Sequence, residues 1–326
     1  MNLIDAHCHL NTNSTAKMKL ALERGAAFVS INTDIPFFEP IAEQERIVLE
    51  LKRNFPEQVR YMGTFESAGF GTSLWLDKAL DQIKKTLDSG ASGIKIWKNF
   101  GMGIKDETGN FVMADDERLF PIYAYLSENR IPIIAHIGEP KNCWLPLEDM
   151  TVDSDRAYFA SHPEYHMYLH SEFPGYQDQI DARDSVLVKY PDLVFIGAHL
   201  GSMEWSLDEV AERLDKFPNF FTDLAERICH LQLQGMSERE KVRNFFIKYQ
   251  DRIIYGSDVI DEQFENEHQA AERIDYLWNY HMKYFSTSET LEAEEFEGQF
   301  QGLDLPDEVV QKILVKNAGR IYGFKI

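Results

Sequence analysis

The sequence predicts an α/β protein built as a single (β/α)8 barrel, and three observations support this fold class. Eight short runs of mostly apolar, often β-branched residues recur along the 326 residues. The runs are nearly continuous in apolar residues, as expected for parallel strands that are buried on both faces. Most of them are followed by a stretch with helical periodicity, and such alternation implies right-handed βαβ units.

The eight expected strands cover residues 3–7, 26–32, 59–65, 92–97, 131–136, 192–199, 219–223 and 252–258. A barrel of this kind needs roughly 250 residues, and more when it carries insertions. An open doubly wound sheet is the rival arrangement. It would leave edge strands to protect, and no G-x-G-x-x-G turn follows the first run to support it.

Four stretches carry helix signals. Residues 76–90 repeat apolar residues every three or four positions and end at a glycine, which is typical of an amphipathic helix and its stop. Residues 116–129 precede the fifth expected strand, and residues 203–217 precede the seventh. Residues 305–324 predict a closing helix, because Pro306 suits a first helical turn.

The length beyond a minimal barrel lies in two insertions within one domain that spans residues 1–326. The first insertion, 139–190, follows the fifth expected strand. The second, 261–305, follows the eighth and contains the acidic segment 289–298. Specificity in such barrels resides in the loops after the strands, so the insertions are where substrate preference is expected to lie. The acidic segment suits a solvated surface or the rim of a homo-oligomer interface.

The composition limits the partners and the location of the protein. The formal net charge is −21, from 54 acidic and 33 basic residues. Long-range repulsion opposes binding to nucleic acid or to an anionic membrane, so we expect a small-molecule substrate. Three widely spaced cysteines do not make a disulfide framework. Neither a signal peptide nor a membrane-spanning stretch is recognisable, and a cytoplasmic location is therefore expected.

Metal-competent side chains lie at the ends of four expected strands. His7 and His9 project to the same face of the first strand, because side chains alternate along a strand. His136, His199 and Asp258 end the fifth, sixth and eighth strands. Active sites of such barrels lie at the carboxyl ends of the strands, so these side chains are expected to converge. Imidazole nitrogen and carboxylate oxygen are ligands that suit Zn²⁺ and other first-row metals.

The metal-site prediction depends on the four strand ends taken together. Ten histidines in 326 residues give about 0.3 H-x-H pairs by chance, so that pattern alone is weak. A single histidine at a strand end is more often a hydrogen-bonded structural residue than a ligand. Four strand ends that all carry metal ligands are much harder to explain without a metal. A bound metal with an open position lowers the pKa of water, and a neighbouring Asp or His then transfers protons.

The motifs I-D-A-H-C-H, P-I-I-A-H-I-G-E-P, F-I-G-A-H-L-G, I-I-Y-G-S-D and N-A-G-R-I-Y-G-F resemble the amidohydrolase superfamily over essentially the whole chain. The sequence is most similar to the amidohydrolase 2 branch, which includes aminocarboxymuconate-semialdehyde decarboxylase and related metal-dependent hydrolases. The resemblance implies one divalent metal ion, Zn²⁺ with Mn²⁺ and Fe²⁺ as alternatives. The implied ligands are His7, His9, His136 and Asp258. It also implies that His199 activates water or polarises the substrate, and that Asp258 shuttles the proton.

Two further residues take their expected roles from this resemblance. Lys95 lies on the fourth expected strand, where binuclear relatives carry a carboxylated lysine that bridges two metals. One metal is usual in the branch resembled here, so Lys95 is expected to be structural or to bind substrate, with the bridged second metal as the alternative. Glu139 matches a recurring family stretch and is expected to orient His136 or Lys95.

The first insertion contains a second group of histidines. His162, His166 and His170 are spaced i, i+4 and i+8, and this spacing predicts one face of a lid helix that starts near Ser161. His166 is the candidate for a substrate contact from this lid. Arg183 is a candidate for binding a substrate carboxylate, although a salt bridge on a helix surface is its expected use.

The sequence is compatible with three functions. The first is a metal-dependent hydrolase that acts on an amide, ester or lactone carbonyl, with Asp258 protonating the leaving group. The second is a non-oxidative decarboxylase that uses the same ligands. The third is a non-catalytic metal-binding protein, which the complete set of ligands disfavours.

Overall fold

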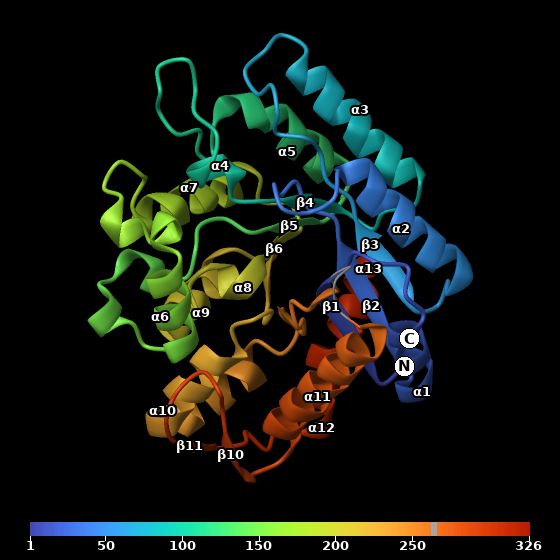
Figure 1. Cartoon of the computed structure of the whole chain (residues 1–326), viewed down its shortest axis with the longest axis vertical. Helices are drawn as coiled ribbons and strands as arrows, with labels where there is room; N and C mark the ends of the chain where they lie inside the picture. Colours follow the sequence, from blue (N-terminus) through green and yellow to red (C-terminus); the bar gives the residue numbers. More distant parts are fainter. Residues whose placement is uncertain (262–265) are drawn as a thin grey trace.

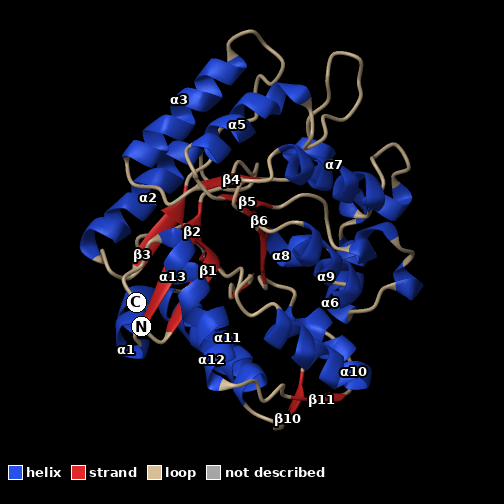
Figure 2. Cartoon of the chain, turned by 180° about the vertical axis from the view of Figure 1, so that it is seen from behind, coloured by secondary structure: helices blue, strands red, loops and turns tan. Residues whose placement is uncertain are grey.

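The computed structural model describes residues 1–261 and 266–326, and it shows a closed parallel barrel surrounded by helices (Figures 1 and 2). The barrel strands are β1 (Leu3–Leu10), β2 (Ala26–Ile31), β3 (Val59–Met62), β4 (Ile94–Ile96), β5 (Ile133–Ala135), β6 (Phe195–Gly197), β7 (Phe220–Asp223) and β8 (Ile253–Ile254). Each of them falls within or overlaps one of the eight expected runs. The expected (β/α)8 barrel is therefore confirmed.

The strands pair in two groups, and two sets of contacts close the barrel. The pairing orders are β3-β2-β1-β9 and β4-β5-β6-β7-β8, where β9 is Ile260–Asp261. A parallel bridge between Gly63 and Ile94 joins β3 to β4. On the other side, the Ala6 amide donates to the Tyr255 carbonyl at 3.0 Å. Because the ring is closed, all the strands deliver their carboxyl ends to one rim.

Helices cover the outside of the barrel (Figure 2). They are α1 (Ala16–Arg24), α2 (Ile41–Asn54), α3 (Trp75–Asp88), α4 (Asn99–Met102), α5 (Phe120–Glu128), α6 (Asp153–Ser161), α7 (Tyr176–Lys189), α8 (Ala198–Gly201), α9 (Leu207–Lys216), α10 (Ile228–Lys248), α11 (Glu267–Ser286), α12 (Asp307–Gln311) and α13 (Asn317–Tyr322). A π-helical turn, Lys312–Lys316, joins α12 to α13. Among the described residues, none of the helices has the length and apolar character needed to span a membrane.

Three of the expected helices appear with changed starting points. The stretch 116–129 begins as a 3₁₀ turn, which Asp116 caps by accepting from the Arg118 amide, and continues as α5. The stretch 203–217 becomes helical only at α9, which Ser206 caps. Pro306 immediately precedes the first residue of α12. Sequence periodicity locates a helix well, but capping side chains decide where it begins.

The expected lid helix at 161–172 is wrong. Two 3₁₀ turns, Pro163–Tyr165 and Met167–Leu169, occupy this segment, and His166 between them has φ −88° and ψ 91°. Proline lacks the amide donor that a continuing helix needs, and His166 instead donates from Nε2 to the Leu145 carbonyl at 2.7 Å. His166 is buried by this contact, so its observed role is to pack the insertion rather than to present a face of histidines.

The position of Arg183 also differs from the expected one. It lies on α7 and is fully buried, not on the helix surface. Nη1 donates to the Gly201 carbonyl at 2.5 Å, and Nε and Nη2 both donate to Asp184 Oδ1, at 3.0 and 2.7 Å. All three guanidinium nitrogens therefore have protein partners. Arg183 fixes the turn after β6, and the Nε and Nη2 edge that would bind a substrate carboxylate is already occupied by Asp184.

Replacing Arg183 with methionine is expected to destabilise the fold by about 3 kcal/mol, because the Gly201 carbonyl and the Asp184 carboxylate lose a buried charged partner. The measurement is the urea midpoint of unfolding. Arg46→Met is the matched control, since Arg46 is exposed and, among the described residues, its ion pairs are with Glu43 and Glu50 on its own helix. Equal midpoints for the two variants would contradict the role given to Arg183.

The second insertion contributes α11 and an antiparallel hairpin, β10 (Thr290–Glu292) with β11 (Gln299–Gln301). The acidic segment 289–298 lies largely in this hairpin and its loop. Trp278 of α11 donates from Nε1 to Asp5 Oδ2 at 2.9 Å. Asp5 also accepts from the amide and the hydroxyl of Ser257, at 2.9 and 2.6 Å. The insertion thus fixes the loop after β8 against β1.

Candidate metal centre

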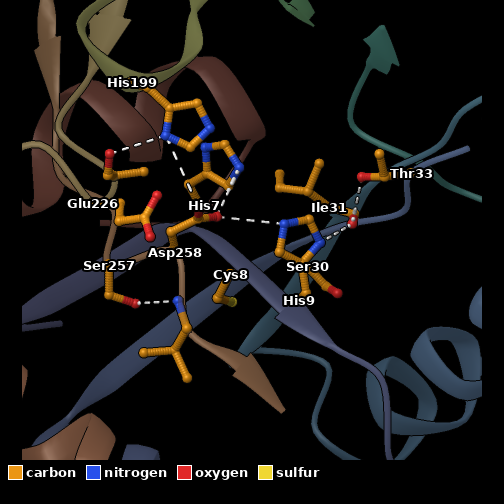
Figure 3. A network of polar contacts seen from close by, with 12 residues as sticks. His7, Cys8, His9, Ser30, Ile31, Thr33, His199, Glu226, Ser257 and Asp258 are labelled. Carbon is orange, nitrogen blue, oxygen red and sulfur yellow. Dashed lines mark hydrogen bonds and ion pairs between the residues drawn. The ribbon is translucent and has the colours of Figure 1, made fainter. Parts of the chain in front are cut away.

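Two histidines of β1 project into the carboxyl-end rim with their ring orientations fixed (Figure 3). His7 Nδ1 lies 2.7 Å from Asp223 Oδ2, and His9 Nδ1 lies 2.7 Å from the Ile31 carbonyl oxygen. Both acceptors are oxygens, so each Nδ1 carries the proton. Each Nε2 is left with a lone pair, which is how proteins prepare histidines for a metal.

Asp258 lies between these imidazoles. Its Oδ1 is 3.3 Å from His7 Nε2 and 3.4 Å from His9 Nε2, and its Oδ2 is 3.9 Å from His199 Nδ1. Its amide donates to the His7 carbonyl at 2.8 Å, which locks the loop to β1. One ligand atom each from His7, His199 and Asp258 fall within 4.8 Å of one another. Such a group is compact enough to surround a single ion.

His199 is held by an unusual backbone. The residues 199–202 all have positive φ, between 57° and 63°, so the segment labelled α8 ends in a left-handed turn. This conformation costs roughly 1–2 kcal/mol for each residue other than glycine. The His199 amide donates to Asp223 Oδ1 at 2.7 Å, and His199 Nδ1 donates to the Ala225 carbonyl at 3.0 Å. Strain that is held in place by such contacts is typical of a functional site.

His136 reaches the same rim from the end of β5. Its ring centroid is 4.3 Å from that of His199, and its Nε2 is 3.9 Å from Glu139 Oε2. The other oxygen of Glu139 forms an ion pair with Lys98. Glu139 therefore lies beside His136, as one of its two expected roles required, but its lysine partner is Lys98 rather than Lys95.

Three buried ligand atoms in this cluster lack a hydrogen-bond partner among the described residues. They are His7 Nε2, His136 Nε2 and Asp258 Oδ1. Buried polar atoms are normally paired, and two imidazole lone pairs beside a carboxylate cannot satisfy one another. A divalent cation would satisfy all three. The residues present therefore fit a metal ion.

The electrostatics keep these groups in the protonation states that metal ligands require. Burial lowers the pKa of His9, His136 and His199, to about 3 in the case of His199. Burial would raise the pKa of Asp258, but the adjacent His7 and His199 hold it well below its usual value. Burial also lowers the pKa of Lys95, to about 8. At neutral pH the imidazoles of His9, His136 and His199 are neutral and Asp258 is ionised.

These shifts make the metal-free protein sensitive to acid. The unfolded chain binds protons at its histidines near pH 6.5, whereas burial lowers the pKa of His136, His199 and His230 in the folded state. The free energy of unfolding that these histidines contribute is therefore fully present above pH 6.5 and falls as the pH drops below 6.5. Glu204, whose pKa burial raises to about 7, opposes this in part. Urea unfolding of metal-free protein should show a loss of about 2–4 kcal/mol from pH 7.5 to 5.5; an unchanged stability would contradict the shifts.

Asp223 at the end of β7 was not among the sequence candidates. It accepts from His7 with one oxygen, and from the amides of His199 and Ala225 with the other. The strand-end rule that selected His136 and His199 applies equally to the last residue of the run 219–223. Lys98, two residues beyond β4, was also missed, and no sequence pattern marks it.

Asp223→Asn is expected to weaken metal binding about 10- to 100-fold, because the amide is a poorer acceptor for His7 Nδ1–H and no longer fixes that ring. Competitive titration with a chelator measures the change. Asp184→Asn serves as a control for a carboxylate that binds arginine away from the centre. An unchanged metal affinity in Asp223→Asn would show that His7 does not depend on this contact.

Comparison with known proteins identifies the family. A family model described as amidohydrolase, of the amidohydrolase 2 type, matches residues 4–324. The chain belongs to the amidohydrolase 2 family. Members of this family are metal-dependent enzymes of the amidohydrolase superfamily, which agrees with the fit of the rim residues to a metal ion. No curated protein matches the chain.

Solved structures agree on the fold of this amidohydrolase 2 protein. An uncharacterized TIM-barrel protein from Bordetella bronchiseptica is 17% identical, with 99% of each chain covered and a TM-score of 0.56. A 2,6-dihydroxybenzoate decarboxylase from Rhizobium is 13% identical, with 99% of each chain covered and a TM-score of 0.55. A D-hydantoinase (dihydropyrimidinase) from Thermus sp. is also 13% identical, covers 99% of this chain and 71% of its own, and has a TM-score of 0.54. At these identities the likeness shows a shared barrel.

Proposed function

We propose that the protein is a hydrolase of an amide, ester or lactone bond in a small molecule, with one divalent metal ion held by His7, His9, His136 and Asp258. The observation that carries this is the set of unpaired buried ligand atoms on His7, His136 and Asp258. Zn²⁺ suits three imidazoles and one carboxylate, and Mn²⁺ or Fe²⁺ is the alternative. When bound, the ion supplies a Lewis acid and lowers the pKa of water towards neutrality.

The side chains of the centre bind and transfer the protons of the reaction. His199 is neutral at working pH, because burial lowers its pKa to about 3, and its Nδ1–H is committed to the Ala225 carbonyl. It therefore presents Nε2 as the acceptor or positioning group for water. The Asp258 carboxylate would accept a proton from water and return it to the leaving group. The fixed backbone at both residues means that little reorganisation precedes the reaction.

A panel of small amides, esters and lactones tests this proposal with protein that has been loaded with Zn²⁺, Mn²⁺ or Fe²⁺. The expected result is turnover of one of the three classes that depends on metal and is lost on chelation. Tight metal binding with no turnover of any compound on the panel would favour a non-catalytic metal-binding protein.

Decarboxylation is the second candidate, and one observation favours it. His136 lies within the electrostatic reach of three cations, Lys98, Lys95 and Arg227, which together with burial lower its pKa. Cations this near to the metal ligands, in a chain of net charge −21, suit a carboxylate substrate. Release of CO₂ from unsaturated or aromatic carboxylates, with no hydrolytic turnover, would replace the hydrolase proposal with this one.

A further inference from the structure

Arg227 lies within electrostatic reach of two other buried polar side chains, Glu204 and His230, and we call these three residues the polar cluster. Glu204, Arg227 and His230 are 1%, 7% and 3% exposed, and each has an atom without a hydrogen-bond partner among the described residues. The unpaired atoms are Glu204 Oε2, Arg227 Nε and His230 Nε2. Unpaired buried polar atoms are rare in native proteins. Three of them in one cluster indicate a place for a polar molecule.

The cluster belongs to the same rim as the metal ligands. Glu204 follows the left-handed turn after β6, and Arg227 and His230 lie at the start of α10, after the neighbouring strand β7. Arg227 is two residues beyond Ala225, whose carbonyl binds His199. Its positive charge lowers the pKa of both His136 and His199. The guanidinium thus lies within electrostatic reach of the metal centre and of Glu204.

The guanidinium of Arg227 makes fewer hydrogen bonds than that of Arg183, another buried arginine. Its hydrogen bonds to described residues both run from Nη1 to Glu226, to the carbonyl at 3.2 Å and to Oε2 at 3.0 Å. The Glu226 side chain is 63% exposed, so this ion pair is weak. Arg183, by contrast, uses all three nitrogens. An arginine fork with a buried, unpaired Nε is suited to bind a carboxylate through two parallel hydrogen bonds.

The acidic neighbours of Arg227 do not compete for this fork. Asp155 of α6 accepts from Asn142 Nδ2 at 2.8 Å and lies 3.6 Å from His230 Nε2. Glu204 Oε1 accepts from the Lys141 amide at 2.8 Å. Burial raises the pKa of Glu204 to about 7, so near neutral pH a large fraction of it is protonated and can donate from Oε2. The cluster therefore offers donors to an anionic group.

We propose that Arg227 binds a carboxylate of the substrate that takes no part in the reaction, with Glu204 and His230 contacting the polar atoms next to it. The substrate is then held at two points, by the metal centre and by Arg227. This rests on the proposed function for the reaction itself, and it assigns the substrate class as a small molecule with a free carboxylate remote from the reacting carbonyl. Arg227, rather than Arg183, is the carboxylate-binding arginine.

Calorimetric titration of Zn²⁺-loaded protein with unreactive dicarboxylates, from malonate to adipate, tests this proposal without turnover. At least one of them should bind wild type, and Arg227→Met should weaken that binding about 10- to 100-fold, the loss expected for a charged hydrogen-bonded pair. Arg227→Lys should lose less, because it keeps the charge. Propionate has one carboxylate and cannot bridge Arg227 and the metal centre, so it should bind wild type more weakly than the best dicarboxylate and lose less on Arg227→Met.

Two controls separate binding from folding. Glu226→Gln removes the partner of Arg227 and should leave dicarboxylate binding unchanged or tighter. The thermal midpoint of Arg227→Met reports whether this variant folds, because Arg227 is buried and its charge also acts on Asp155 and Glu204. If Arg227→Met melts early, Arg227→Gln is measured in its place: a folded Arg227→Gln that binds the dicarboxylate as tightly as wild type then overturns the proposal. Equal binding by folded Arg227→Met, or no dicarboxylate binding to wild type, also overturns it.

The same experiments distinguish this proposal from the proposed function. Dicarboxylate binding that depends on Arg227, with no hydrolysis on the substrate panel, would leave the carboxylate site in place and remove the hydrolase. Hydrolysis that is equally fast for panel members with and without a remote carboxylate would keep the hydrolase and remove the carboxylate site.

Discussion

Asp258→Asn is expected to reduce the metal content of the purified protein to well below one ion per chain and to lower turnover by about a thousandfold or more. Asp258 Oδ1 is the oxygen nearest to both His7 Nε2 and His9 Nε2, at 3.3 and 3.4 Å. An amide in its place removes the negative charge and directs either a weak ligand or an N–H donor at those lone pairs. Elemental analysis and the turnover assay measure the two effects.

The backbone should survive this change, which makes the result interpretable. Asp258 has φ 62°, a conformation that asparagine adopts more readily than most residues. Asp304→Asn is the matched control, because Asp304 also has a positive φ, of 48°, and is exposed far from the metal ligands in sequence. Full metal content and full activity in Asp258→Asn, with Asp304→Asn also unaffected, would rule out the proposed centre.

His136→Ala and His199→Asn are expected to separate metal binding from chemistry. His136→Ala should lose the metal, because its Nε2 is an unpaired buried ligand atom. His199→Asn should keep the metal and lose turnover by about 10²- to 10⁴-fold, the usual contribution of an acid–base group. Asparagine is chosen because His199 has φ 59°, where alanine would add strain.

The opposite result would make His199 a ligand, as the compact group of His7, His199 and Asp258 allows. If His199→Asn loses the metal while His136→Ala retains it, then His199 is a ligand and His136 is not. Proton transfer would in that case have to be assigned to another residue. Metal affinity measured with a chelator on both variants, beside turnover, decides between the two ligand sets.

The barrel could be predicted from the sequence because its strands are buried on both faces. A strand such as β5 (Ile133–Ala135) has almost no polar positions, and its neighbours along the chain repeat that pattern at the spacing of βα units. The convergence of His7, His9 and His199 also followed from topology alone, since parallel strands end at one rim. Neither inference needed side-chain detail.

What the sequence could not supply depends on backbone geometry and on contacts between distant segments. The left-handed turn at 199–202 contains a single glycine and gives no warning of its conformation. The histidine spacing at 162, 166 and 170 fits a helix, but Pro163 and a side-chain bond to a distant carbonyl divert that segment. The sequence around Arg183 suggests a surface residue, whereas in the structure Arg183 is buried and donates to the Gly201 carbonyl.

The number of metal ions per chain, from elemental analysis of protein purified without a histidine tag, tests whether the rim residues form a mononuclear metal centre. One ion per chain is the expected result, because one ligand atom each from His7, His199 and Asp258 fall within 4.8 Å of one another, a spacing that fits a single ion. Two ions would indicate that a carboxylated Lys95 bridges a binuclear centre, which is the alternative to the mononuclear site proposed for this enzyme. No metal after supplementation with Zn²⁺, Mn²⁺ or Fe²⁺ would contradict the account outright, because these imidazoles and this carboxylate would then not be ligands.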